Sequence, residues 1–539
     1  MGDLRPLGVR ISQLLKSRGV EVIFGIPGVH NIELYRGITQ AGLTHILARH
    51  EQGAGFMADG YARASGRPGV AYVITGPGLC NILTALGQAY SDSVPVLVMS
   101  SCLDETAACR GQLHQMRDQA AAAATVCAWS LEARSASAAY GLVDRALAEF
   151  TATRARPRHI QVPVALLAAP APPAPSAPPA ARPSLRDAPP AAEPLAQAAR
   201  MLAQAQHPLM IFGGGAVHAA PEARAVVAQC QAASFTTYAG RGIIAAGTPL
   251  HFGSWLARPE SAAILGKADV VMVVGSELSE VDFWRADSGI RHRLIRVDLD
   301  AGVLGSLPAD VAVLGDARAF LRALAHALPQ RGRSAWQAAE VAAARARWYK
   351  ESNSLRPHIA PICAALQAVL PETTMYFSDM TQFAYVAKEI WDMPAPGLWH
   401  HPYGFGTLGY ALPAAIGGAV ARLGARLGVR PQAPVVCIAG DYGFQYSLAE
   451  LGTAVELGLS LPILLWDNGK LAEIEECMIA NQIAPHGVVA YNPDFAQLAA
   501  AYGAGFAAPR SLAALQGAVA EALAAPRPTL IRLRPECAC

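Results

Sequence analysis

The sequence predicts an α/β protein with three domains, each built on a doubly wound parallel sheet. Short apolar runs rich in β-branched residues alternate with helical patterns along most of the 539 residues. Such alternation is typical of a parallel sheet covered by helices on both faces. A Pro/Ala-rich tract at 168–192 interrupts the pattern, which then resumes. A chain of this length is also too long for one ordinary domain.

The N-terminal domain is predicted to span residues 1–167. The tract at 168–192 follows it, and its prolines lack the N–H groups that a hydrogen-bond ladder needs. We therefore expect a semi-rigid linker there. The strands predicted in the N-terminal domain lie at 20–24, 44–48, 70–75 and 94–100.

A central domain is predicted for residues 193–345. Gly213–Gly215 follow its first strand and would admit a dinucleotide phosphate, and Asp298 at a later strand end would take a ribose hydroxyl. The full Gly-x-Gly-x-x-Gly pattern is not met, which favours a tight turn over a nucleotide site. The predicted strands lie at 208–212, 268–274 and 294–297.

The C-terminal domain is predicted for residues 366–539, after a connecting helix at 346–365. It contains apolar runs of strand length and helical patterns in its last part. The predicted elements are strands at 434–439, 461–466 and 528–533 and helices at 494–501 and 511–524.

A helix is predicted between the first two of these strands. Ser447 and Glu450 form a Ser-x-x-Glu capping box that marks its start, and Gly458 marks its end. The resulting β-α-β unit places Asp441 after its first strand and Asn468 after its second. Because the carboxyl ends of parallel strands share one sheet edge, we expect both side chains there, where carboxylate and amide oxygens suit Mg²⁺ with a phosphate.

The charge and hydropathy of the chain exclude several classes of partner. Lys plus Arg number 43 and Asp plus Glu 41, so a net charge of +2 gives no electrostatic basis for binding nucleic acid or an acidic membrane. Charged side chains interrupt the first twenty residues, and no apolar stretch reaches the length of a membrane span. The ten cysteines contain no Cys-x-x-Cys pair. We expect a cytoplasmic protein with reduced thiols.

The segment at 440–443, Gly-Asp-Tyr-Gly, followed by Asp467-Asn468, resembles the motif of thiamine diphosphate enzymes, in which Gly-Asp-Gly opens and Asn-Asn closes a stretch of about this length. The resemblance implies that Asp441, the Asn468 side chain and the Lys470 carbonyl hold Mg²⁺ against the cofactor diphosphate. The sequence departs from the motif at Tyr442 and Asp467. The implied cofactor-binding residues are Gly440, Asp441, Tyr442, Gly443 and Asn468.

A second segment, at 49–63, resembles the one that carries the catalytic glutamate of these enzymes. The resemblance implies that Glu51 hydrogen-bonds N1' of the aminopyrimidine and drives it to the imino form, with burial raising the affinity of the carboxylate for the shared proton. On its own, a glutamate on the first turn of a helix is more often a solvated residue near the helix dipole. Thr75, Gly76 and Asn81 follow at the family's distance and are implied to bind the cofactor.

A glycine-rich segment at 404–413 resembles a third part of the family's site. Its glycines let the backbone approach a flat ring closely. The resemblance implies that the Gly406 carbonyl accepts a hydrogen bond from the 4'-amino group and that Leu408 is the apolar wedge that bends the cofactor. A weaker match at 379–382 implies that Gln382 lies near the diphosphate.

Together these segments make the chain similar to the pyruvate decarboxylase and acetohydroxyacid synthase group, whose domains bind the pyrimidine, form a central unit and bind the diphosphate, in this order. In that group the glutamate of one chain faces the diphosphate domain of another, so the resemblance implies at least a homodimer and favours a homotetramer. The loop at 274–280 lacks the Arg-Phe-Asp-Asp-Arg-like string of the members that contain FAD, so FAD is not expected.

The predicted reaction is the loss of CO₂ from a 2-oxo acid. His114 and Gln115 are candidate catalytic residues, and the reference pKa of histidine suits proton transfer, although a lone histidine is more often structural. Val29, His30 and Glu473 are candidate substrate contacts. A carboxylate at Glu473 suits a guanidinium or ammonium tail, and the chain looks most like the 5-guanidino-2-oxopentanoate (2-ketoarginine) decarboxylases.

Three alternatives stay open at this point. Glu473 also fits an ordinary solvated acidic start of a helix. An acetolactate synthase-type carboligase would join two pyruvates instead of releasing an aldehyde. A noncatalytic thiamine diphosphate-binding scaffold would account for the departures at Tyr442 and Asp467.

Overall fold

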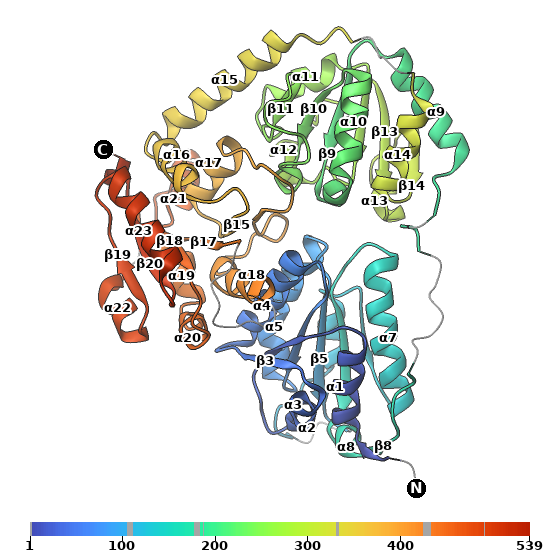
Figure 1. The fold of residues 1–539 in the computed structure, drawn as a ribbon, viewed down its shortest axis with the longest axis vertical. Helices are drawn as coiled ribbons and strands as arrows, with labels where there is room; N and C mark the ends of the chain where they lie inside the picture. Colours follow the sequence, from blue (N-terminus) through green and yellow to red (C-terminus); the bar gives the residue numbers. More distant parts are fainter. Residues whose placement is uncertain are drawn as a thin grey trace.

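The computed structural model confirms three domains, each with its own six-stranded parallel sheet (Figure 1). Figure 1 shows helix α15 (Ala338–Leu355) running along the outside of the molecule from the central to the C-terminal domain. Within the predicted linker at 168–192, residues 177–183 and 187 lie outside the described residues. The structure describes residues 3–104, 111–176, 184–186, 188–329, 334–423, 433–489 and 491–538.

The N-terminal sheet has the strand order β3-β2-β4-β5-β7-β6. All four strands predicted here are confirmed, with ends that differ by at most two residues. A short antiparallel pair, β1 with β8, ties the start of the chain to the start of the predicted linker. The strands are β1 (Arg5–Pro6), β2 (Val22–Gly25), β3 (Thr44–Leu47), β4 (Gly69–Val73), β5 (Val96–Cys102), β6 (Trp129–Glu132), β7 (Arg158–Pro163) and β8 (Pro170–Ala171). The helices are α1 (Leu7–Ser17), α2 (Ile32–Arg36), α3 (Ile38–Ala41), α4 (Glu51–Ser65), α5 (Pro77–Ser91), α6 (Gln119–Ala124), α7 (Ala136–Ala152) and α8 (Val164–Ala168).

The central sheet has the order β11-β10-β9-β12-β13-β14, and its predicted strands are confirmed. The strands are β9 (Pro208–Phe212), β10 (Ala233–Thr236), β11 (His251–Gly253), β12 (Val270–Val274), β13 (Arg293–Asp298) and β14 (Val311–Leu314). The helices are α9 (Ala192–Gln204), η1 (Gly214–Ala219), α10 (Ala220–Cys230), η2 (Tyr238–Gly240), α11 (Ser261–Lys267), α12 (Glu280–Phe283), α13 (Ala301–Ser306) and α14 (Ala317–Ala327).

The C-terminal sheet has the order β16-β15-β17-β18-β20-β19. The segment predicted as a connecting helix at 346–365 contains the end of α15 and the start of α16, with a turn between them. The strands are β15 (Met375–Ser378), β16 (Trp399–His400), β17 (Val435–Gly440), β18 (Pro462–Trp466), β19 (Gly505–Ala507) and β20 (Thr529–Leu533). The helices are α16 (Ile359–Val369), α17 (Gln382–Ile390), α18 (Ala411–Leu423), α19 (Asp441–Tyr446), α20 (Glu450–Glu456), α21 (Ala472–Ala480), α22 (Phe495–Tyr502), α23 (Leu512–Ala524) and η3 (Pro535–Ala538).

The capping box predicted at Ser447 and Glu450 is wrong. Ser447 follows the last residue of α19, and α20 starts only at Glu450 itself. The Glu450 carboxylate instead accepts the backbone N–H groups of Arg49 and His50, each at 3.0 Å, from the N-terminal domain. A local pattern assumes a local partner, so it does not reveal a hydrogen bond across a domain boundary.

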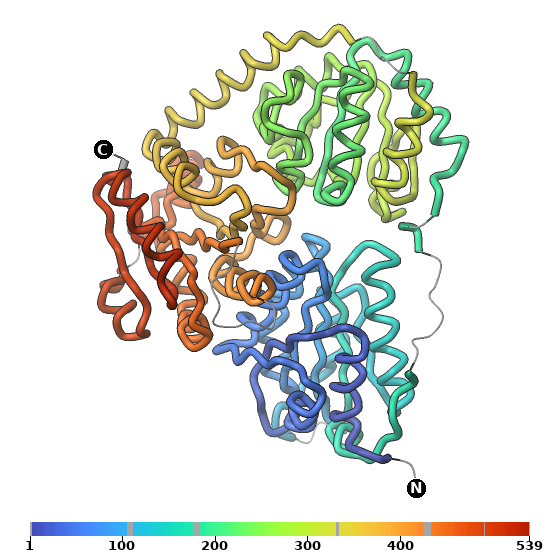
Figure 2. The backbone as a smooth tube through the Cα atoms, viewed as in Figure 1, coloured from blue at the N-terminus to red at the C-terminus, as the bar shows by residue number. Residues whose placement is uncertain are grey.

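The N-terminal and C-terminal domains share one hydrophobic core across helices α4 and α18, which lie side by side in Figure 2. A Cβ on Gly60 would lie 2.0 Å from the Ala414 carbonyl oxygen, and one on Gly417 would lie 1.9 Å from the Met57 carbonyl oxygen. Only glycine allows two helix backbones to approach this closely. These two glycines therefore fix how the first and third domains pack within one chain.

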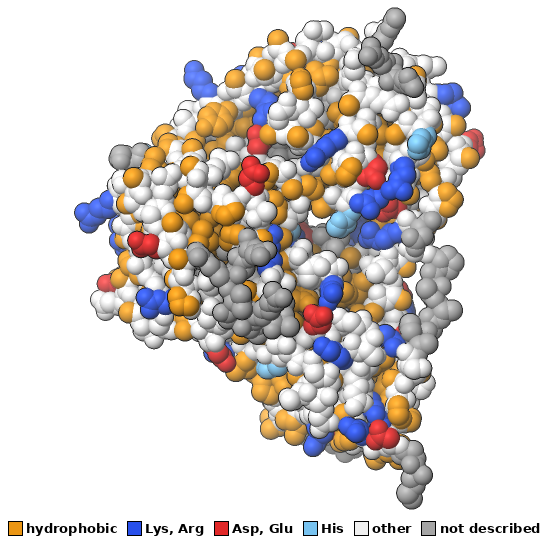
Figure 3. Space-filling model, viewed as in Figure 1, with side chains coloured by type: hydrophobic (Ala, Val, Ile, Leu, Met, Phe, Trp, Pro, Cys, Tyr) orange, Lys and Arg blue, Asp and Glu red, His pale blue; other side chains and the backbone are white. Residues whose placement is uncertain are grey.

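The surface shows no single sign of charge on the face drawn in Figure 3, where basic and acidic side chains are scattered among uncharged ones. This agrees with the near balance of 43 basic and 41 acidic residues. Among the described helices, none combines the length and the apolarity needed to cross a bilayer.

Candidate active site

Asp441 lies at the carboxyl edge of the C-terminal sheet, where the neighbouring parallel strands β17 and β18 both end. Its carboxylate accepts the backbone N–H of Gly469 at 2.7 Å and the side-chain amide of Asn492 at 2.7 Å. Asp441 is 3% exposed, and burial raises the pKa of its carboxyl group. The loops after β17 and β18 therefore meet at one buried acid, as the sequence predicted.

Asn468 connects this edge to helix α17. Its side-chain amide donates to Gln382 Oε1 at 3.3 Å, and Gln382 is the first residue of α17. The backbone N–H of Lys470 donates to Asn468 Oδ1 at 3.4 Å, and Lys470 pairs with Val489 in an isolated bridge. The structure thus brings the predicted Asp441, Asn468, Lys470 and Gln382 into one cluster.

The donor set at this edge fits Mg²⁺ bound together with a diphosphate. In the described part of the chain, no three His, Cys, Asp or Glu side chains are grouped so that they alone would hold a metal. The predicted set of the Asp441 carboxylate, the Asn468 amide oxygen and the Lys470 carbonyl supplies one negative charge and two neutral oxygens. Mg²⁺ is commonly held by one or two carboxylates plus phosphate oxygens and waters, so this set agrees with a metal that needs the cofactor to complete its shell.

The sequence departs from the motif at Tyr442, but the next position, Gly443, where a side chain would not fit, is still a glycine. A Cβ on Gly443 would lie 2.8 Å from Asp379 Oδ2, so a larger residue is excluded there. The Tyr442 ring packs against the ring of Tyr446, with centroids 5.7 Å apart. The motif therefore keeps its glycine where the backbone meets a buried acid, and Tyr442 is accommodated by a neighbouring ring.

The departure at Asp467 has its own partners. The carboxylate accepts two hydrogen bonds from the Arg534 guanidinium, at 2.9 and 2.7 Å, and one from the Asn492 amide at 3.1 Å. The Asp467 side chain is only 4% exposed, and a buried carboxylate needs such a counter-charge. Asn492 and Arg534 were not predicted as site residues, because neither lies in a recognisable motif.

The glycine-rich segment at 404–413 approaches the same acid that faces Gly443. The Gly409 N–H donates to Asp379 Oδ2 at 2.8 Å, and the Met380 N–H donates to Oδ1 at 2.8 Å. Asp379 is 1% exposed, and burial raises its pKa to about 7. Gly406 has φ +65°, and Leu408 lies half-buried on the same segment. Asp379 therefore holds two predicted cofactor segments together.

Glu51 is the first residue of helix α4 and is 9% exposed. The Asn81 side-chain amide donates to Glu51 Oε2 at 2.8 Å. A Cβ on Gly78 would lie 3.3 Å from Glu51 Oε1, so glycine keeps the approach to this oxygen open. The sequence placed Glu51 and Asn81 in one site, and the structure joins them by a hydrogen bond.

The Thr75-Gly76 turn is held by side chains of the neighbouring strand β5 and of helix α6. The Thr75 hydroxyl donates to Ser101 Oγ at 2.8 Å, and the Gly76 N–H donates to Gln119 Oε1 at 2.9 Å. Gly76 has φ +69°, and a Cβ there would lie 2.3 Å from the His114 carbonyl oxygen. The loop that carries His114 therefore rests on this turn. Gln119, which is buried, was not predicted as a site residue.

His30 and His114 form a histidine pair at this place. Their ring centroids lie 4.9 Å apart in an edge-to-face arrangement. Burial, and then the nearby His114, lower the pKa of His30. Val29 is 63% exposed, and Gln115 accepts the Gln112 N–H through its side chain at 3.2 Å. The pair supplies two imidazoles next to the segment that carries Thr75 and Gly76.

Glu473 lies on the C-terminal domain, in the first turn of α21. The Gln382 side-chain amide donates to Glu473 at 3.3 Å and to Glu476 at 3.2 Å. The same Gln382 accepts the Asn468 amide, so the two glutamates lie one side chain away from a predicted metal ligand. The guanidinium of Arg356 forms ion pairs with both glutamates.

The predicted site residues form two groups within the single chain. Glu51, Asn81, His30 and His114 belong to the N-terminal domain, whereas the cluster around Asp441 belongs to the C-terminal domain. Among the described residues, no hydrogen bond joins Glu51 or Asn81 to that cluster.

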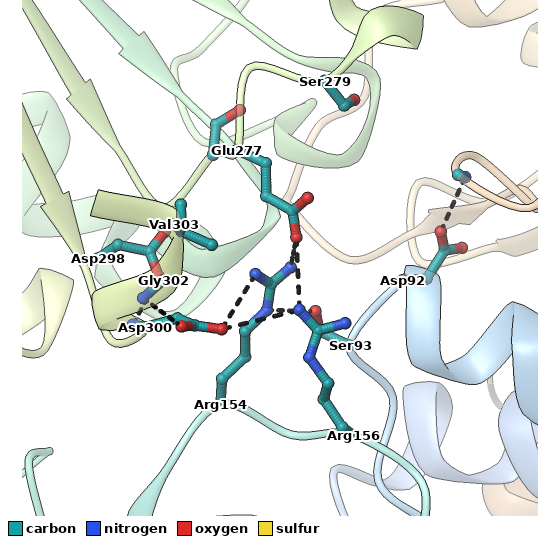
Figure 4. Close-up of polar contacts among 12 residues, drawn as sticks. Asp92, Ser93, Arg154, Arg156, Glu277, Ser279, Asp298, Asp300, Gly302 and Val303 are labelled. Atoms are coloured by element: carbon teal, nitrogen blue, oxygen red, sulfur yellow. Dashed lines mark hydrogen bonds and ion pairs between the residues drawn. The ribbon is translucent and has the colours of Figure 1, made fainter. Parts of the chain in front are cut away.

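The carboxyl edge of the central sheet is closed by ion pairs from the N-terminal domain (Figure 4). Arg154 and Arg156 reach Glu277 and Asp300, with the Arg156 pairs at 3.8 and 3.7 Å. These arginines and Asp300 line a cavity of about 490 Å³ between the two domains.

The glycine triplet after β9 is used for packing. A Cβ on Gly213 would lie 2.3 Å from the Gly275 carbonyl oxygen, and one on Gly215 would lie 2.8 Å from the Gly275 Cα. The geometry agrees with the tight turn favoured from the sequence.

The chain is similar to known proteins along most of its length. A probable 2-ketoarginine decarboxylase of Pseudomonas aeruginosa is 43% identical over 536 residues, which cover 98% of this chain and 94% of the relative. Residues 7–122, 195–324 and 379–533 match the N-terminal TPP binding, central and C-terminal TPP binding domains of thiamine pyrophosphate enzymes. The chain belongs to the thiamine pyrophosphate enzyme family. Thiamine pyrophosphate is thiamine diphosphate, so the predicted resemblance to thiamine diphosphate enzymes is confirmed.

More distant members of the thiamine pyrophosphate enzyme family also match along most of the chain. The large subunit of acetolactate synthase isozyme 2 of Escherichia coli is 28% identical, covering 91% of this chain and 88% of the relative. A probable acetolactate synthase large subunit of Methanocaldococcus jannaschii is 27% identical, covering 92% and 85%.

Proposed function

We propose that this chain is a thiamine diphosphate- and Mg²⁺-dependent decarboxylase of a 2-oxo acid with a cationic tail, with 5-guanidino-2-oxopentanoate as the candidate substrate. The observation that carries the proposal is the pair of glutamates, Glu473 and Glu476, held by Gln382 beside Asn468. Two adjacent carboxylates suit a guanidinium, whose planar fork can donate to both. The similarity to the Pseudomonas aeruginosa relative supports the same substrate class.

In this proposal the C-terminal edge holds the cofactor. Asp441, Asn468 and the Lys470 carbonyl would hold Mg²⁺, and Gly440, Tyr442 and Gly443 would lie beside the diphosphate. The Gly406 carbonyl would accept a hydrogen bond from the 4'-amino group, and Leu408 would be the apolar wedge beneath the cofactor. Thiamine diphosphate supplies a carbon nucleophile and an electron sink for the bond next to the substrate carbonyl.

Glu51 and the two histidines move protons in this proposal. Glu51 Oε2 already accepts the Asn81 amide, so Oε1 would be the oxygen that shares a proton with the pyrimidine N1' when the cofactor is bound. Asn81 is then a positioning residue that fixes the rotamer of Glu51. His30, whose pKa burial lowers, and His114 exchange protons at the reacting carbon, with Gln115 and Val29 beside them.

We further propose that the two groups of site residues meet between chains, in at least a homodimer and most simply a homotetramer. The support is that Glu51 and Asp441 lie in separate groups within one chain, while α4 and α18 are already used to join the two domains internally. We place the enzyme in the cytoplasm, since all the cysteines in the described residues are free thiols.

An assay of CO₂ release over a panel of 2-oxo acids tests the function. We expect faster release from 2-ketoarginine than from pyruvate, and release that depends on added thiamine diphosphate and Mg²⁺. Equal or faster use of pyruvate would contradict the substrate class. Failure to bind thiamine diphosphate in Mg²⁺, measured by titration calorimetry, would favour the noncatalytic scaffold.

A carboligase is the second candidate, favoured by the match to acetolactate synthase large subunits along most of the chain. It predicts acetolactate from two pyruvates, which product analysis of the same assay detects. A yellow purified protein with a flavin spectrum would strengthen it, because the proposed decarboxylase needs no FAD.

A further inference from the structure

We infer that Arg356 is a specificity-determining residue, an internal guanidinium that competes with the cationic tail of the substrate for Glu473 and Glu476. The inference rests on the proposed function and adds a residue from outside every motif of the family. The affinity for the substrate tail then depends on how strongly Arg356 competes with the tail for the two carboxylates.

The geometry places Arg356 on the same two carboxylates as the proposed tail. Its Nη2 lies 3.5 Å from Glu473 Oε2 and also forms an ion pair with Glu476. Gln382 donates to both glutamates from the side of Asn468. The two glutamates therefore lie between Arg356 and the predicted metal edge, and a tail entering from that edge meets carboxylates that already have a guanidinium partner.

The backbone fixes Arg356 at this place. Helix α15 ends at Leu355, and the N–H of Arg356 still bonds the Ser352 carbonyl at 3.2 Å. Pro357 follows, and a residue before proline is disfavoured in the helical region. Arg356 accordingly has φ −141° and ψ 68° as the residue that leaves the helix.

The charge balance leaves room for one added cation. Helix α21 begins with Glu473, Glu475 and Glu476, and Lys470 pairs with Glu475. Among the described residues, Arg356 is the other base in ion-pair contact with these acids, so Glu473 and Glu476 share one guanidinium, while the Lys388 ammonium also attracts Glu473 from outside ion-pair distance. A substrate tail with a single positive charge would pair with the carboxylates that share Arg356.

Arg356 is held weakly enough to yield. Its side chain is 25% exposed, and those of Glu473 and Glu476 are 52% and 49% exposed. Ion pairs in such exposed positions contribute little because water screens them. A competing tail therefore displaces Arg356 at a small cost in free energy. We expect removal of Arg356 to change the affinity for the substrate by a small factor.

The test compares Arg356→Ala with wild type in steady-state CO₂ release from 2-ketoarginine and from 2-oxohexanoate, whose tail is neutral. We expect KM for 2-ketoarginine to fall roughly two- to fivefold, with kcat little changed and both constants for 2-oxohexanoate unchanged. Arg356→Lys, which keeps the charge, should stay close to wild type. Arg347→Ala is the matched control, because it removes an exposed ion pair of α15 with Glu351.

A charge exchange makes the test independent of any general effect of one mutation. The double variant Glu473→Gln, Glu476→Gln frees Arg356, so we expect it to gain CO₂ release from 2-oxoadipate, whose tail is a carboxylate. Adding Arg356→Ala should abolish that gain. Equal thermal unfolding temperatures show that the variants are folded.

The outcomes separate the inference from the function. An unchanged or raised KM for 2-ketoarginine in Arg356→Ala, with wild type active on that substrate, would overturn the role of Arg356. Absence of CO₂ release by wild type from 2-ketoarginine, with release from other 2-oxo acids, would instead overturn the proposed substrate class.

Discussion

The N-terminal and C-terminal domains have the same sheet topology but carry different functional groups. Numbered within each sheet, both have the strand order 2-1-3-4-6-5, whereas the central sheet has 3-2-1-4-5-6. Helix α4 follows the second strand of the first sheet and α18 the second strand of the third. These equivalent helices pack on each other through Gly60 and Gly417, so one chain holds two copies of one architecture face to face.

This difference shows that the functional groups of each domain depend on the residues that follow its strands and not on the topology of its sheet. The C-terminal edge presents a buried acid, Asp441, among amides, whereas the N-terminal domain presents Glu51 at a helix start next to Asn81. The central sheet has the strand order typical of dinucleotide-binding folds, yet Arg154 and Arg156 close its edge. Topology alone does not assign a ligand to a sheet.

Glu51→Gln gives the largest expected effect. The amide keeps the size of the side chain but does not share a proton with the pyrimidine, so we expect kcat to fall by roughly 10²- to 10⁴-fold. Thiamine diphosphate binding, measured by titration calorimetry, should be retained. Glu21→Gln, an exposed glutamate paired with Arg67, is the control and should be fully active. Full activity of Glu51→Gln would contradict a catalytic role for Glu51 and for the N-terminal half of the site.

Asp441→Asn and Asp467→Asn compare two neighbouring acids of the C-terminal edge. Asp441 is the proposed metal ligand, so its change should weaken binding of Mg²⁺ and thiamine diphosphate by roughly 100-fold or more. Asp467 faces Arg534, so its change should cost stability and weaken cofactor binding by less than about tenfold. Equal losses of binding in calorimetry would contradict the separate roles.

Gly60→Ala tests the contact between the two equivalent helices. The added methyl would meet the Ala414 carbonyl, and overpacking of this kind costs roughly 1–3 kcal/mol of the free energy of unfolding. Gly141→Ala in α7 is the matched control, since its Cβ would meet no atom within 4 Å. That change should stabilise the chain by about 0.4–1 kcal/mol. Urea unfolding measures both, and equal effects would show that α4 and α18 do not depend on close approach.

His159 gives the smallest expected effect, a pH dependence of the N-terminal domain. It is fully buried between Ser100 and Ser130, and burial lowers its pKa to about 3. The unfolded chain, with a histidine pKa of about 6.5, binds the proton more tightly, so stability is lost as the pH falls below that value. Between pH 7.5 and 5.5, His159→Gln should lose about 1 kcal/mol less unfolding free energy than wild type. Parallel curves would contradict a neutral His159.

Much of this arrangement was predictable from the sequence. The strands followed from apolar runs, and the Glu51–Asn81 and Asp441–Gly469 contacts lie inside recognisable segments. The cross-domain hydrogen bonds of Glu450 were not predictable, because a capping box encodes only neighbours in sequence.

The hydrogen-bonding and ion-pair partners that lie outside the motifs were also not predictable from the sequence. Asn492, Arg534 and Arg356 reach their acids from distant loops and from the end of a helix. No pattern within any of these segments specifies such a contact, since each depends on how segments distant in sequence pack together in the folded chain.

The central claim is that the N-terminal half of one chain and the C-terminal half of another form one site. Two inactive variants, Glu51→Gln and Asp441→Asn, are co-refolded or co-expressed with different tags, and the mixed oligomer is purified and assayed for CO₂ release. Every mixed dimer would contain one doubly altered site and one intact site, so we predict recovery of about half the wild-type activity per dimer. A purified mixed oligomer without activity would contradict the account, because it would place both halves of each site in a single chain.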